Sequence, residues 1–325
     1  MIICCGMVLA DCIVTESGSE DVADDIALSP GGEALNEAIG LARLGETVLL
    51  CAPVAHDFAG KAIRELLRAE GVQVVSDHDG PTPVSLLTVD AAGERRSRVS
   101  KAHGLAGWRP RLPMAQASDD IGAGDPGVLT DPERSSGRTS DETLYMVTMA
   151  SLFRPPFLDP DACLSFALDV KAAGALLLAD TKMPKGARPV LSDYARTLAL
   201  LDFITPNEEE ALYYTGTQNA PDAARVFRSF GVRNVIIKRG PEGCLCLPED
   251  GEEFECRAYP VSCVDGIGAG DAFAAGLISR LAAGDTLSDA VRFASACGAV
   301  STTKRGAVSA IRSQAQIREF INKNS

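Results

Sequence analysis

The sequence predicts a three-layer α/β/α protein, in which a mainly parallel β-sheet lies between two layers of helices. Short apolar segments that suit buried strands alternate with segments of helical periodicity, which is typical of right-handed βαβ units. The 325 residues, 46% of them hydrophobic, suffice for a single large domain over residues 1–325. One pair of strand-like segments stands outside this alternation and predicts a small additional β lid.

The strands of the central sheet are predicted from six apolar runs that are short and rich in aliphatic residues. They are residues 2–8, 47–52, 144–149, 175–180, 203–205 and 234–238. A helix is expected from Ala34 to Ala42, because Leu35, Ala38 and Ile39 complete a spacing of i, i+3, i+4 and i+7. That helix would begin directly after two glycines.

The β lid is predicted from residues 84–89 and 94–100, two extended runs that a turn at 90–93 would join. With residues that precede the first helix, the lid would comprise about 12–30 and 82–100, and because a lone hairpin is marginally stable it should pack on a partner surface. We expect that surface to be the same lid of a second subunit, which predicts a homodimer. Residues 107–141 are rich in Pro, Gly, Ser and charge, so we expect a mobile surface loop.

Composition excludes several classes of partner. With 31 Lys plus Arg against 44 Asp plus Glu, the net charge of -13 repels nucleic acids and anionic membrane surfaces. No segment offers ~20 uninterrupted apolar residues, so no membrane span is expected. The ten cysteines contain no C-x-x-C pair and suit small buried side chains in a reducing cytoplasm.

A run of small residues leads into a helix near the carboxyl end of the chain. It reads Val264-Asp265-Gly266-Ile267-Gly268-Ala269-Gly270-Asp271, and apolar residues with helical spacing follow. Unpaired amides at the start of that helix would converge on one point and bind a phosphate. A carboxylate beside a phosphate is unfavourable unless it does chemistry, so Asp271 is a candidate general base for an attacking hydroxyl. The alternative is that Asp271 only caps the helix.

Two other glycine-rich nucleotide motifs do not fit. A dinucleotide fingerprint needs Gly or Ala at the position of Asp271, whose charge would oppose a pyrophosphate. A Walker loop around Gly60-Lys61 would have Ala55 in place of its first glycine and Ala62 in place of its hydroxyl residue.

With the run that ends in Asp271, three other segments make the chain resemble the ribokinase-like (pfkB) carbohydrate kinase family. One begins Gly31-Gly32-Glu33-Ala34-Leu35-Asn36, another is Asn207-Glu208-Glu209-Glu210, and the third is Ile237-Lys238-Arg239-Gly240-Pro241-Glu242-Gly243. They occur in the family's order and cover the chain except for roughly 105–142, and ordered motifs are far more specific than any one alone. The resemblance implies a ribokinase-like fold and an enzyme that transfers the γ-phosphate of ATP to a hydroxyl of a small sugar.

The resemblance also implies roles for individual residues, each of which its chemistry supports. The sugar hydroxyls would be bound by Asp11, Gly31, Gly32, Asn36 and Asp271. The transferring phosphate would lie on amides of Gly268, Ala269 and Gly270, with Asp271 as the base. The nucleotide would contact Asn207, Lys238, Gly240, Gly243, Gly268, Gly270, Ala294 and Gly298, with Val300 beside the purine. Asn207 and Glu210 would hold Mg²⁺ through water, and Asp265 with the Ile267 carbonyl would hold a monovalent cation such as K⁺.

Two departures from the family pattern leave the acceptor open. Gly266 and Ile267 replace two threonine-like residues, and Asp180-Thr181-Lys182 stands where fructose-specific members often have D-P-N-x-R. A nucleoside kinase of the same fold and a non-catalytic sugar-binding regulator remain alternatives. A phosphorylated sugar is disfavoured, because no basic cluster is evident in the expected pocket except the group Arg95, Arg96 and Arg98 on the lid.

Overall fold

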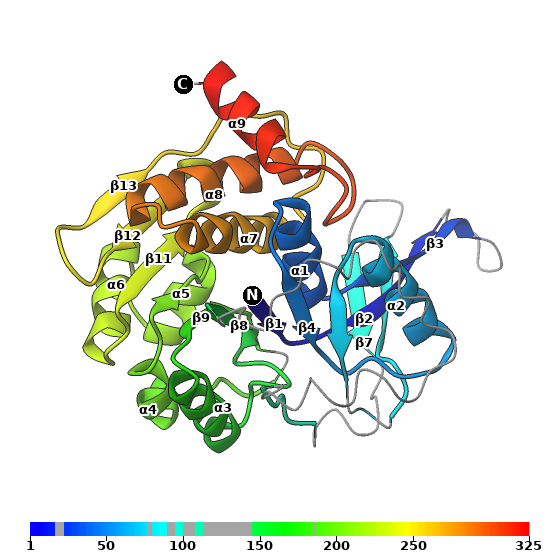
Figure 1. Ribbon diagram of the computed structural model, residues 1–325, viewed down its shortest axis with the longest axis horizontal. Helices are drawn as coiled ribbons and strands as arrows, with labels where there is room; N and C mark the ends of the chain where they lie inside the picture. Colours follow the sequence, from blue (N-terminus) through cyan, green and yellow to red (C-terminus); the bar gives the residue numbers. More distant parts are fainter. Residues whose placement is uncertain are drawn as a thin grey trace, which may run out of the picture.

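The central element of the fold is a large, mostly parallel sheet (Figure 1). The computed structural model describes residues 1–16, 23–76, 78, 80–89, 95–99, 108–112, 145–184 and 186–324. Within these residues the sheet has nine strands in the order β13-β12-β11-β10-β9-β8-β1-β4-β5. Neighbouring strands from β5 through β4, β1, β8, β9 and β10 to β11 run parallel. At the other end of the sheet, β12 pairs antiparallel with β11 and β13 pairs antiparallel with β12. The strands are β1 (Ile2–Cys5), β4 (Val48–Cys51), β5 (Gln73–Val75), β8 (Met146–Leu152), β9 (Leu176–Thr181), β10 (Phe203–Ile204), β11 (Asn234–Lys238), β12 (Cys244–Leu247) and β13 (Phe254–Cys256).

Helices cover both faces of this sheet, because successive strand residues point to opposite sides. Ile2 and Cys4 join one core with α1, α2, α7, α8 and α9, and Ile3 and Cys5 join a second core with α3 to α6. The helices are α1 (Glu33–Arg43), α2 (Phe58–Ala69), α3 (Pro160–Ala172), α4 (Ala195–Leu198), α5 (Glu208–Thr215), α6 (Ala220–Ser229), α7 (Ala269–Ala282), α8 (Leu287–Ser301) and α9 (Gln314–Lys323), with 3-10 turns at Leu191–Tyr194 and Gly240–Glu242. The three-layer prediction is confirmed, as are the six predicted strands and the first helix.

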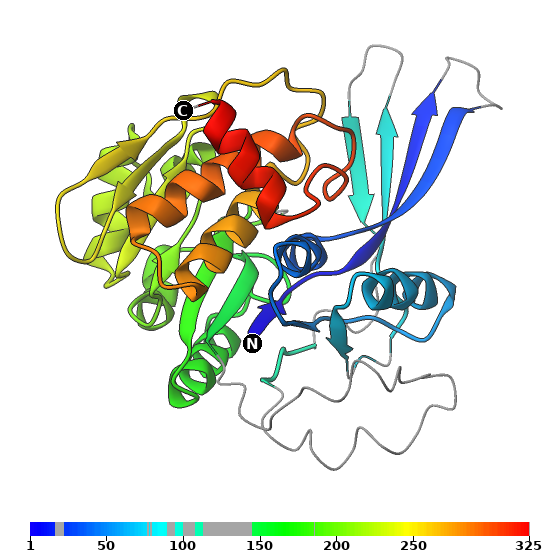
Figure 2. The same ribbon diagram turned by 45° about the horizontal axis from the view of Figure 1, so that its top comes forward.

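A smaller sheet stands beside the main body (Figure 2). Its order is β3-β2-β6-β7, formed by β2 (Leu9–Glu16), β3 (Ala23–Gly31), β6 (Val84–Val89) and β7 (Arg95–Val99). We call it the small sheet. The predicted antiparallel pairing of residues 84–89 with 94–100 is present, although its turn lies outside the described residues.

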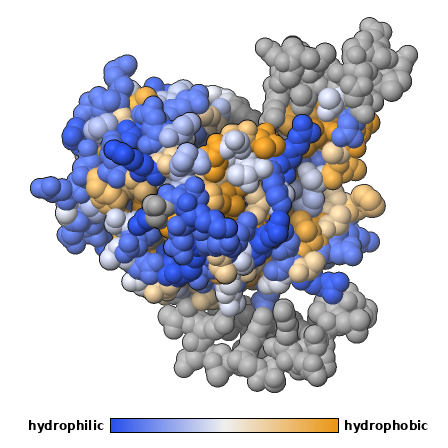
Figure 3. All heavy atoms as spheres, turned by 90° about the horizontal axis from the view of Figure 1, so that it is seen from above, coloured by the Kyte–Doolittle hydropathy of each residue, from blue (hydrophilic) through white to orange (hydrophobic). Residues whose placement is uncertain are grey.

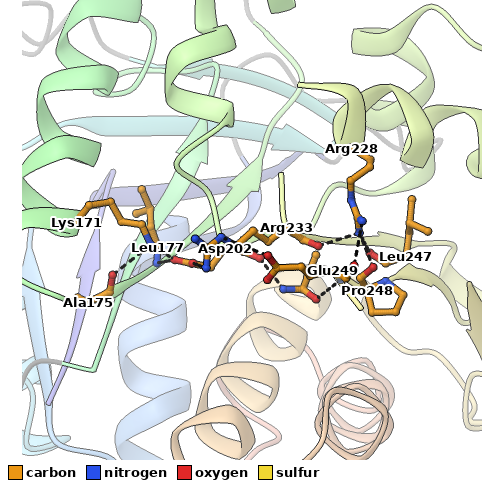
Figure 4. Close-up of polar contacts among 10 residues, drawn as sticks. Lys171, Ala175, Leu177, Asp202, Arg228, Arg233, Leu247, Pro248 and Glu249 are labelled. Atoms are coloured by element: carbon orange, nitrogen blue, oxygen red, sulfur yellow. Dashed lines mark hydrogen bonds and ion pairs between the residues drawn. The ribbon is translucent and has the colours of Figure 1, made fainter. Parts of the chain in front are cut away.

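The two ends of β9 and β10 differ in character. At the amino ends, Asp202 accepts hydrogen bonds from the Lys171 ammonium and, at 2.7 Å, from the Leu177 amide (Figure 4). The Arg233 guanidinium lies 3.6 Å from the same carboxylate. Arg228 donates to the backbone carbonyls of Arg233, Leu247 and Pro248. We call Lys171, Asp202 and Arg233 the amino-end cluster.

Helices α1 and α8 pack closely against α7, because glycines remove side-chain bulk at their contacts. A Cβ on Gly40 of α1 would lie 2.9 Å from the Ala275 Cβ of α7, and a Cβ on Gly276 would lie 2.8 Å from the Cys297 sulfur of α8. Real Cβ atoms do not approach that closely, so these helices depend on glycine here. One turn before the Gly40–Ala275 contact, the close approach sets Asn36 against Asp271.

Of the segment 107–141, the structure describes only 108–112, where Trp108 and Leu112 are buried. The predicted mobility of the remainder lies outside the described residues. Among the helices described, none is long and apolar enough to cross a membrane. All ten cysteines are free thiols.

Candidate active site

A cavity of about 1780 Å³ opens at the carboxyl edge of the central sheet. This is the edge at which parallel α/β sheets bind ligands. Its walls come from the starts of α1 and α7, from the residues that end β8, β9 and β11, and from the small sheet. The lining includes Asp11, Gly32, Glu33, Asn36, Ser151, Asp180, Lys182, Asn207, Glu210, Lys238, Gly240, Gly243, Ile267, Gly268, Ala269, Gly270, Asp271 and Gly298.

The glycine turn forms the start of α7 as the sequence predicts. Gly268 is the N-cap residue, with a φ of 80°, and a Cβ there would lie 2.6 Å from Ala307. A side chain is therefore excluded by both backbone conformation and space. The amides of Gly270 and Asp271 have no protein acceptor in the part of the chain that the structure describes. They remain available to an anion at the helix start.

One oxygen of the Asp271 carboxylate accepts a hydrogen bond that fixes the side chain, and the other oxygen is available to a ligand. Its Oδ2 accepts a hydrogen bond of 2.7 Å from the Asn36 side-chain amide. Its Oδ1 is buried and has no hydrogen-bond partner among the described residues. Burial raises the pKa of Asp271 and Glu33 adds to the rise, whereas Lys182 and the bond from Asn36 oppose it. A fixed carboxylate with a free oxygen and a raised pKa suits a general base.

A lysine lies beside that free oxygen. The Lys182 ammonium is 3.6 Å from Asp271 Oδ1 and 4.0 Å from Glu33 Oε1. Glu33 also accepts a hydrogen bond of 3.3 Å from the Ser151 hydroxyl. Burial alone would lower the pKa of Lys182, but Asp271, Asp180 and Glu33 raise it above its usual value, so this ammonium keeps its proton.

A second lysine lies on the other side of the glycine turn. The Lys238 ammonium donates to Asp180 Oδ1 at 2.7 Å, and Thr205 donates to the same oxygen at 2.9 Å. A Cβ on Gly270 would be 3.2 Å from the Lys238 nitrogen, so the lysine reaches the start of α7. Only 14% of its side chain is exposed, which excludes an ordinary surface lysine.

Asn207 and Glu210 form the capping box of α5. Asn207 Oδ1 accepts from the Glu210 amide at 2.8 Å, and Glu210 Oε2 accepts from the Asn207 amide at 3.1 Å and from Thr181 at 2.8 Å. Burial raises the pKa of Glu210, and Asp180 raises it further. The two residues thus build the helix start and also line the cavity.

The first glycine pair shapes the wall of the cavity nearest the small sheet. A Cβ on Gly31 would lie 2.0 Å from Asp11 Oδ2, and a Cβ on Gly32, whose φ is 107°, would lie 2.4 Å from the Met7 carbonyl. Gly31 is not among the lining residues. It makes room for the Asp11 carboxylate, and Asp11 does line the cavity.

The predicted nucleotide contacts, including those to the purine, divide into two groups. Gly240, Gly243 and Gly298 line the cavity. Ala294 and Val300 are instead buried in the core and are not among the lining residues, because Ala294 packs directly against Gly276. Ser295 and Ala299 of α8 and its C-cap residue Thr302 line the cavity wall where Ala294 and Val300 were expected.

The predicted monovalent-cation pair closes a loop next to the glycine turn. Asp265 accepts hydrogen bonds of 3.1 Å from the amides of Ile267 and Gly306. Ile267 lines the cavity, and Asp265 does not appear in its lining. Among the described residues, no group of three or more His, Cys, Asp or Glu side chains is arranged to hold a metal ion.

Sequence reasoning missed several residues that line the cavity or support it: Glu33, Glu37, Ser151, Asp180 and Lys182. A signal existed for the last two, because a polar triplet directly after a buried apolar strand marks the ligand edge of a sheet. The basic side chains Arg154, Lys182, Arg188 and Lys238 line the cavity, whereas the sequence analysis found no evident basic cluster in the expected pocket. Arg98 pairs with the exposed Leu86 on the outer face of the small sheet, and the side chains of Arg95 and Arg96 lie outside the described residues.

Comparison with models of protein families identifies the family to which this chain belongs. The model of the pfkB family carbohydrate kinases matches residues 1–107 and 146–314. The chain belongs to this family. It is therefore an ATP-dependent sugar kinase, and the predicted family and activity are confirmed.

Among curated proteins, this pfkB kinase is 25% identical to a ribokinase of Haemophilus influenzae, a match that covers 94% of this chain and 92% of the relative. It is 28% identical to an aminoimidazole riboside kinase of Salmonella typhimurium, over 91% of this chain and 89% of the relative. These names span free sugars and a riboside, so they leave the acceptor of this kinase open.

Solved structures share the fold. A ribokinase of Arabidopsis thaliana complexed with ribose and ATP gives a TM-score of 0.78 at 20% identity, over 98% of each chain. A fructokinase of Vibrio cholerae with bound fructose, ADP and potassium ion gives 0.73 at 22% identity, over 98% of this chain and 97% of the other. An E. coli protein whose structure was solved in complex with ATP and Mg²⁺ gives 0.71 at 24% identity, over 99% of each chain.

Proposed function

We propose that this kinase uses Asp271 as the general base that removes the proton from the acceptor hydroxyl. The observation that carries the proposal is the state of its carboxylate: Asn36 fixes Oδ2, whereas Oδ1 has no hydrogen-bond partner among the described residues. The γ-phosphate of ATP would accept hydrogen bonds from the Gly270 and Asp271 amides and contact Lys238. Asp271 would then lie at the junction of phosphate and acceptor, as in-line transfer requires.

Mg²⁺ would be held through water by Asn207, Glu210 and Asp180. The structure supports this because Asp180 Oδ2 is buried without a hydrogen-bond partner among the described residues, and oxygen ligands suit this ion.

K⁺ would bind at Asp265 and the Ile267 carbonyl. Faster turnover in KCl than in NaCl or tetramethylammonium chloride supports the K⁺ site, and equal rates in all three remove it.

The acceptor would be a small neutral sugar or a riboside. Asp11, Glu33 and Asn36 offer hydrogen-bonding groups for hydroxyls, and Met7, Leu9 and Val99 line the same cavity with apolar surface. That apolar surface is what a nucleoside base would need, so a nucleoside kinase is the second candidate.

A panel assay of ATP consumption separates these candidates. The acceptors would be pentoses, hexoses, sugar acids, sugar phosphates and ribosides, each with and without Mg²⁺. We expect Mg²⁺-dependent turnover with one neutral sugar or riboside and none with sugar phosphates. Turnover restricted to ribosides identifies a nucleoside kinase, and binding of a sugar without turnover of any acceptor contradicts the proposed function.

We also propose that the outer face of the small sheet joins two copies of the chain. Leu28 and Ile26 are 71% and 63% exposed, and the register sets Leu28 and Leu86 on either side of Cys12. Figure 3 shows apolar surface, in orange, on the side of the molecule that carries this sheet. Alternate residues such as Asp11 and Ser85 face the cavity instead, so a dimer would support the wall that holds the acceptor.

Sedimentation of the wild type and of Leu28→Lys tests this interface. We expect a wild-type dimer and a Leu28→Lys monomer, because a charge on a buried apolar contact is costly. A monomeric wild type at assay concentration, or a variant that remains dimeric, contradicts it.

The free thiols of all ten cysteines fit the reducing cytoplasm that we propose as the compartment.

A further inference from the structure

Lys182 is one of the charged residues lining the cavity for which the family resemblance supplied no role. Its ammonium stands 3.6 Å from Asp271 Oδ1, the oxygen that is free to accept a proton, and 4.0 Å from Glu33 Oε1. Its side chain is 24% exposed and lines the cavity. The lysine therefore reaches the oxygen at which the proposed proton transfer occurs.

The backbone fixes this lysine at the edge of the sheet. The Lys182 amide donates to the Leu152 carbonyl at 3.2 Å, and its carbonyl accepts from the Tyr214 hydroxyl at 2.5 Å. Tyr214 in turn packs on Phe153, with ring centroids 4.2 Å apart. Residues in or directly after β8, β9 and α5 contribute to this anchor, so the backbone of Lys182 is fixed directly after the end of β9.

We propose that Lys182 is a catalytic cation that stabilises the negative charge formed at the acceptor oxygen when the phosphoryl group is transferred. This inference rests on Asp271 as the base. Before transfer, the ammonium faces the carboxylates of Asp271 and Glu33. During transfer, the acceptor O–H bond breaks and its proton goes to Asp271 Oδ1. The acceptor oxygen bonds to the γ-phosphorus, and the bond from the γ-phosphorus to the bridging oxygen breaks, with its electron pair left on ADP.

Proton transfer changes what surrounds the ammonium. Asp271 becomes neutral, so the charge of Lys182 is no longer balanced by Asp271 and acts on the acceptor oxygen and the phosphoryl group. An interaction that strengthens only as charge moves lowers the barrier, whereas uniform binding does not.

The electrostatics around the pair involve several elements. Acidic groups that act on Lys182 come from α1, β9, α5 and α7, and they are Glu33, Glu37, Asp180, Glu210 and Asp271. Lys238 lies beyond Asp180 and is paired with it. Lys182 is thus the cation nearest the Asp271 carboxylate among the described residues. Its removal should make Asp271 harder to ionise, so the acidic limb of the pH profile should move to higher pH.

The chain offers a matched control. Lys171 pairs with Asp202 outside the cavity, and the exposed side-chain fractions are 26% and 3%, close to the 24% and 6% of Lys182 and Asp271. Lys171→Met therefore removes a comparable ion pair without touching the cavity. Steady-state kinetics from pH 5 to pH 9 and urea unfolding would be measured for Lys182→Met, Lys182→Arg and Lys171→Met.

We expect Lys182→Met to lower kcat at least ~100-fold, to leave the KM for ATP within about threefold, and to move the acidic limb upward by about one pH unit. Lys182→Arg should keep the limb near its wild-type position and recover part of kcat, since the charge remains. Lys171→Met should lose stability only. If Lys182→Met does not fold, the limb of Lys182→Arg remains informative, because a shift of that limb despite the retained charge overturns the proposal.

Other results also overturn it. One is a Lys182→Met enzyme with wild-type kcat. Another is a Lys182→Met enzyme whose acidic limb does not move and whose loss of kcat is no larger than its loss of folded protein, so that it behaves as Lys171→Met does. If Asp271→Asn is inactive while Lys182→Met is normal, the base stands and only the cation is refuted. An active Asp271→Asn refutes the proposed function itself.

Discussion

The two ends of β9 and β10 carry the same chemistry arranged for different purposes. At the amino ends, Lys171 and the Leu177 amide donate to one oxygen of Asp202 (Figure 4). Its other oxygen, Oδ1, is buried without a hydrogen-bond partner among the described residues and lies 3.6 Å from the Arg233 guanidinium. At the carboxyl ends, Asp271 and Asp180 each keep a buried oxygen without a hydrogen-bond partner among the described residues, next to Lys182 and a cavity. The two ends therefore differ in access: Asp180 and Asp271 line the cavity and Asp202 does not. A buried carboxylate outside the cavity serves the fold, whereas one that lines the cavity is available to a substrate.

The largest expected effect separates the two ends by one substitution at each. Asp271→Asn should lower kcat at least ~100-fold with little change in ATP affinity, because an amide cannot accept the proton. Asp202→Asn should lower the free energy of unfolding by about 3 kcal/mol with kcat per folded molecule unchanged. Kinetics, calorimetric ATP binding and urea unfolding measure both. Equal kinetic losses for the two variants would abolish the distinction.

Lys238→Met should have a smaller effect, on nucleotide binding. The ammonium lies beside Gly270 at the start of α7, and loss of one charge-assisted phosphate contact should raise the KM for ATP about tenfold. Lys171→Met serves again as the control, with no change in KM expected. An unchanged KM in Lys238→Met would place the phosphates elsewhere than at the glycine turn.

The smallest effect concerns Glu37, which is fully buried on α1 and accepts a hydrogen bond of 2.8 Å from Thr148. Burial raises the pKa of Glu37 well above its usual value, and Asp180 and Asp271 raise it further. Since the folded state holds this proton more tightly, the contribution of Glu37 to stability is full below about pH 4.3 and falls as pH rises through its folded pKa.

Glu37→Gln removes that titration and should make stability less dependent on pH. The wild type should lose up to about 1.4 kcal/mol per pH unit relative to the variant above about pH 4.3. Urea unfolding at fixed ionic strength from pH 4 to pH 9 measures the difference. A difference that stays constant with pH, or grows in the opposite direction, would show that Glu37 is not buried as a proton-holding acid.

The sequence predicted the architecture because strand and helix periodicity depend on local residues. It also located Asp271, Asn36, Lys238 and the glycines, because their motifs are contiguous and each is explained by one element. It did not predict Lys182 beside Asp271, since that proximity depends on how the end of β9 meets the start of α7.

The misplacement of Ala294 and Val300 has a related cause. The sequence shows that α8 is rich in small residues, but small residues serve equally at a ligand wall and at a close helix contact. Here Gly276 brings α7 against Ala294, so the wall is formed by the neighbouring Ser295, Gly298 and Ala299. Which face of a helix meets the cavity is decided by packing, which the sequence alone did not supply.

The most direct test is a crystal structure with a non-hydrolysable ATP analogue, Mg²⁺ and the acceptor that the panel identifies. The account predicts an acceptor hydroxyl within about 3.2 Å of Asp271 Oδ1, with the Lys182 ammonium beside that hydroxyl and the terminal phosphate on the Gly270 amide. An acceptor whose hydroxyls all lie beyond about 4 Å from Asp271, in a complex with the phosphate in place, would contradict it.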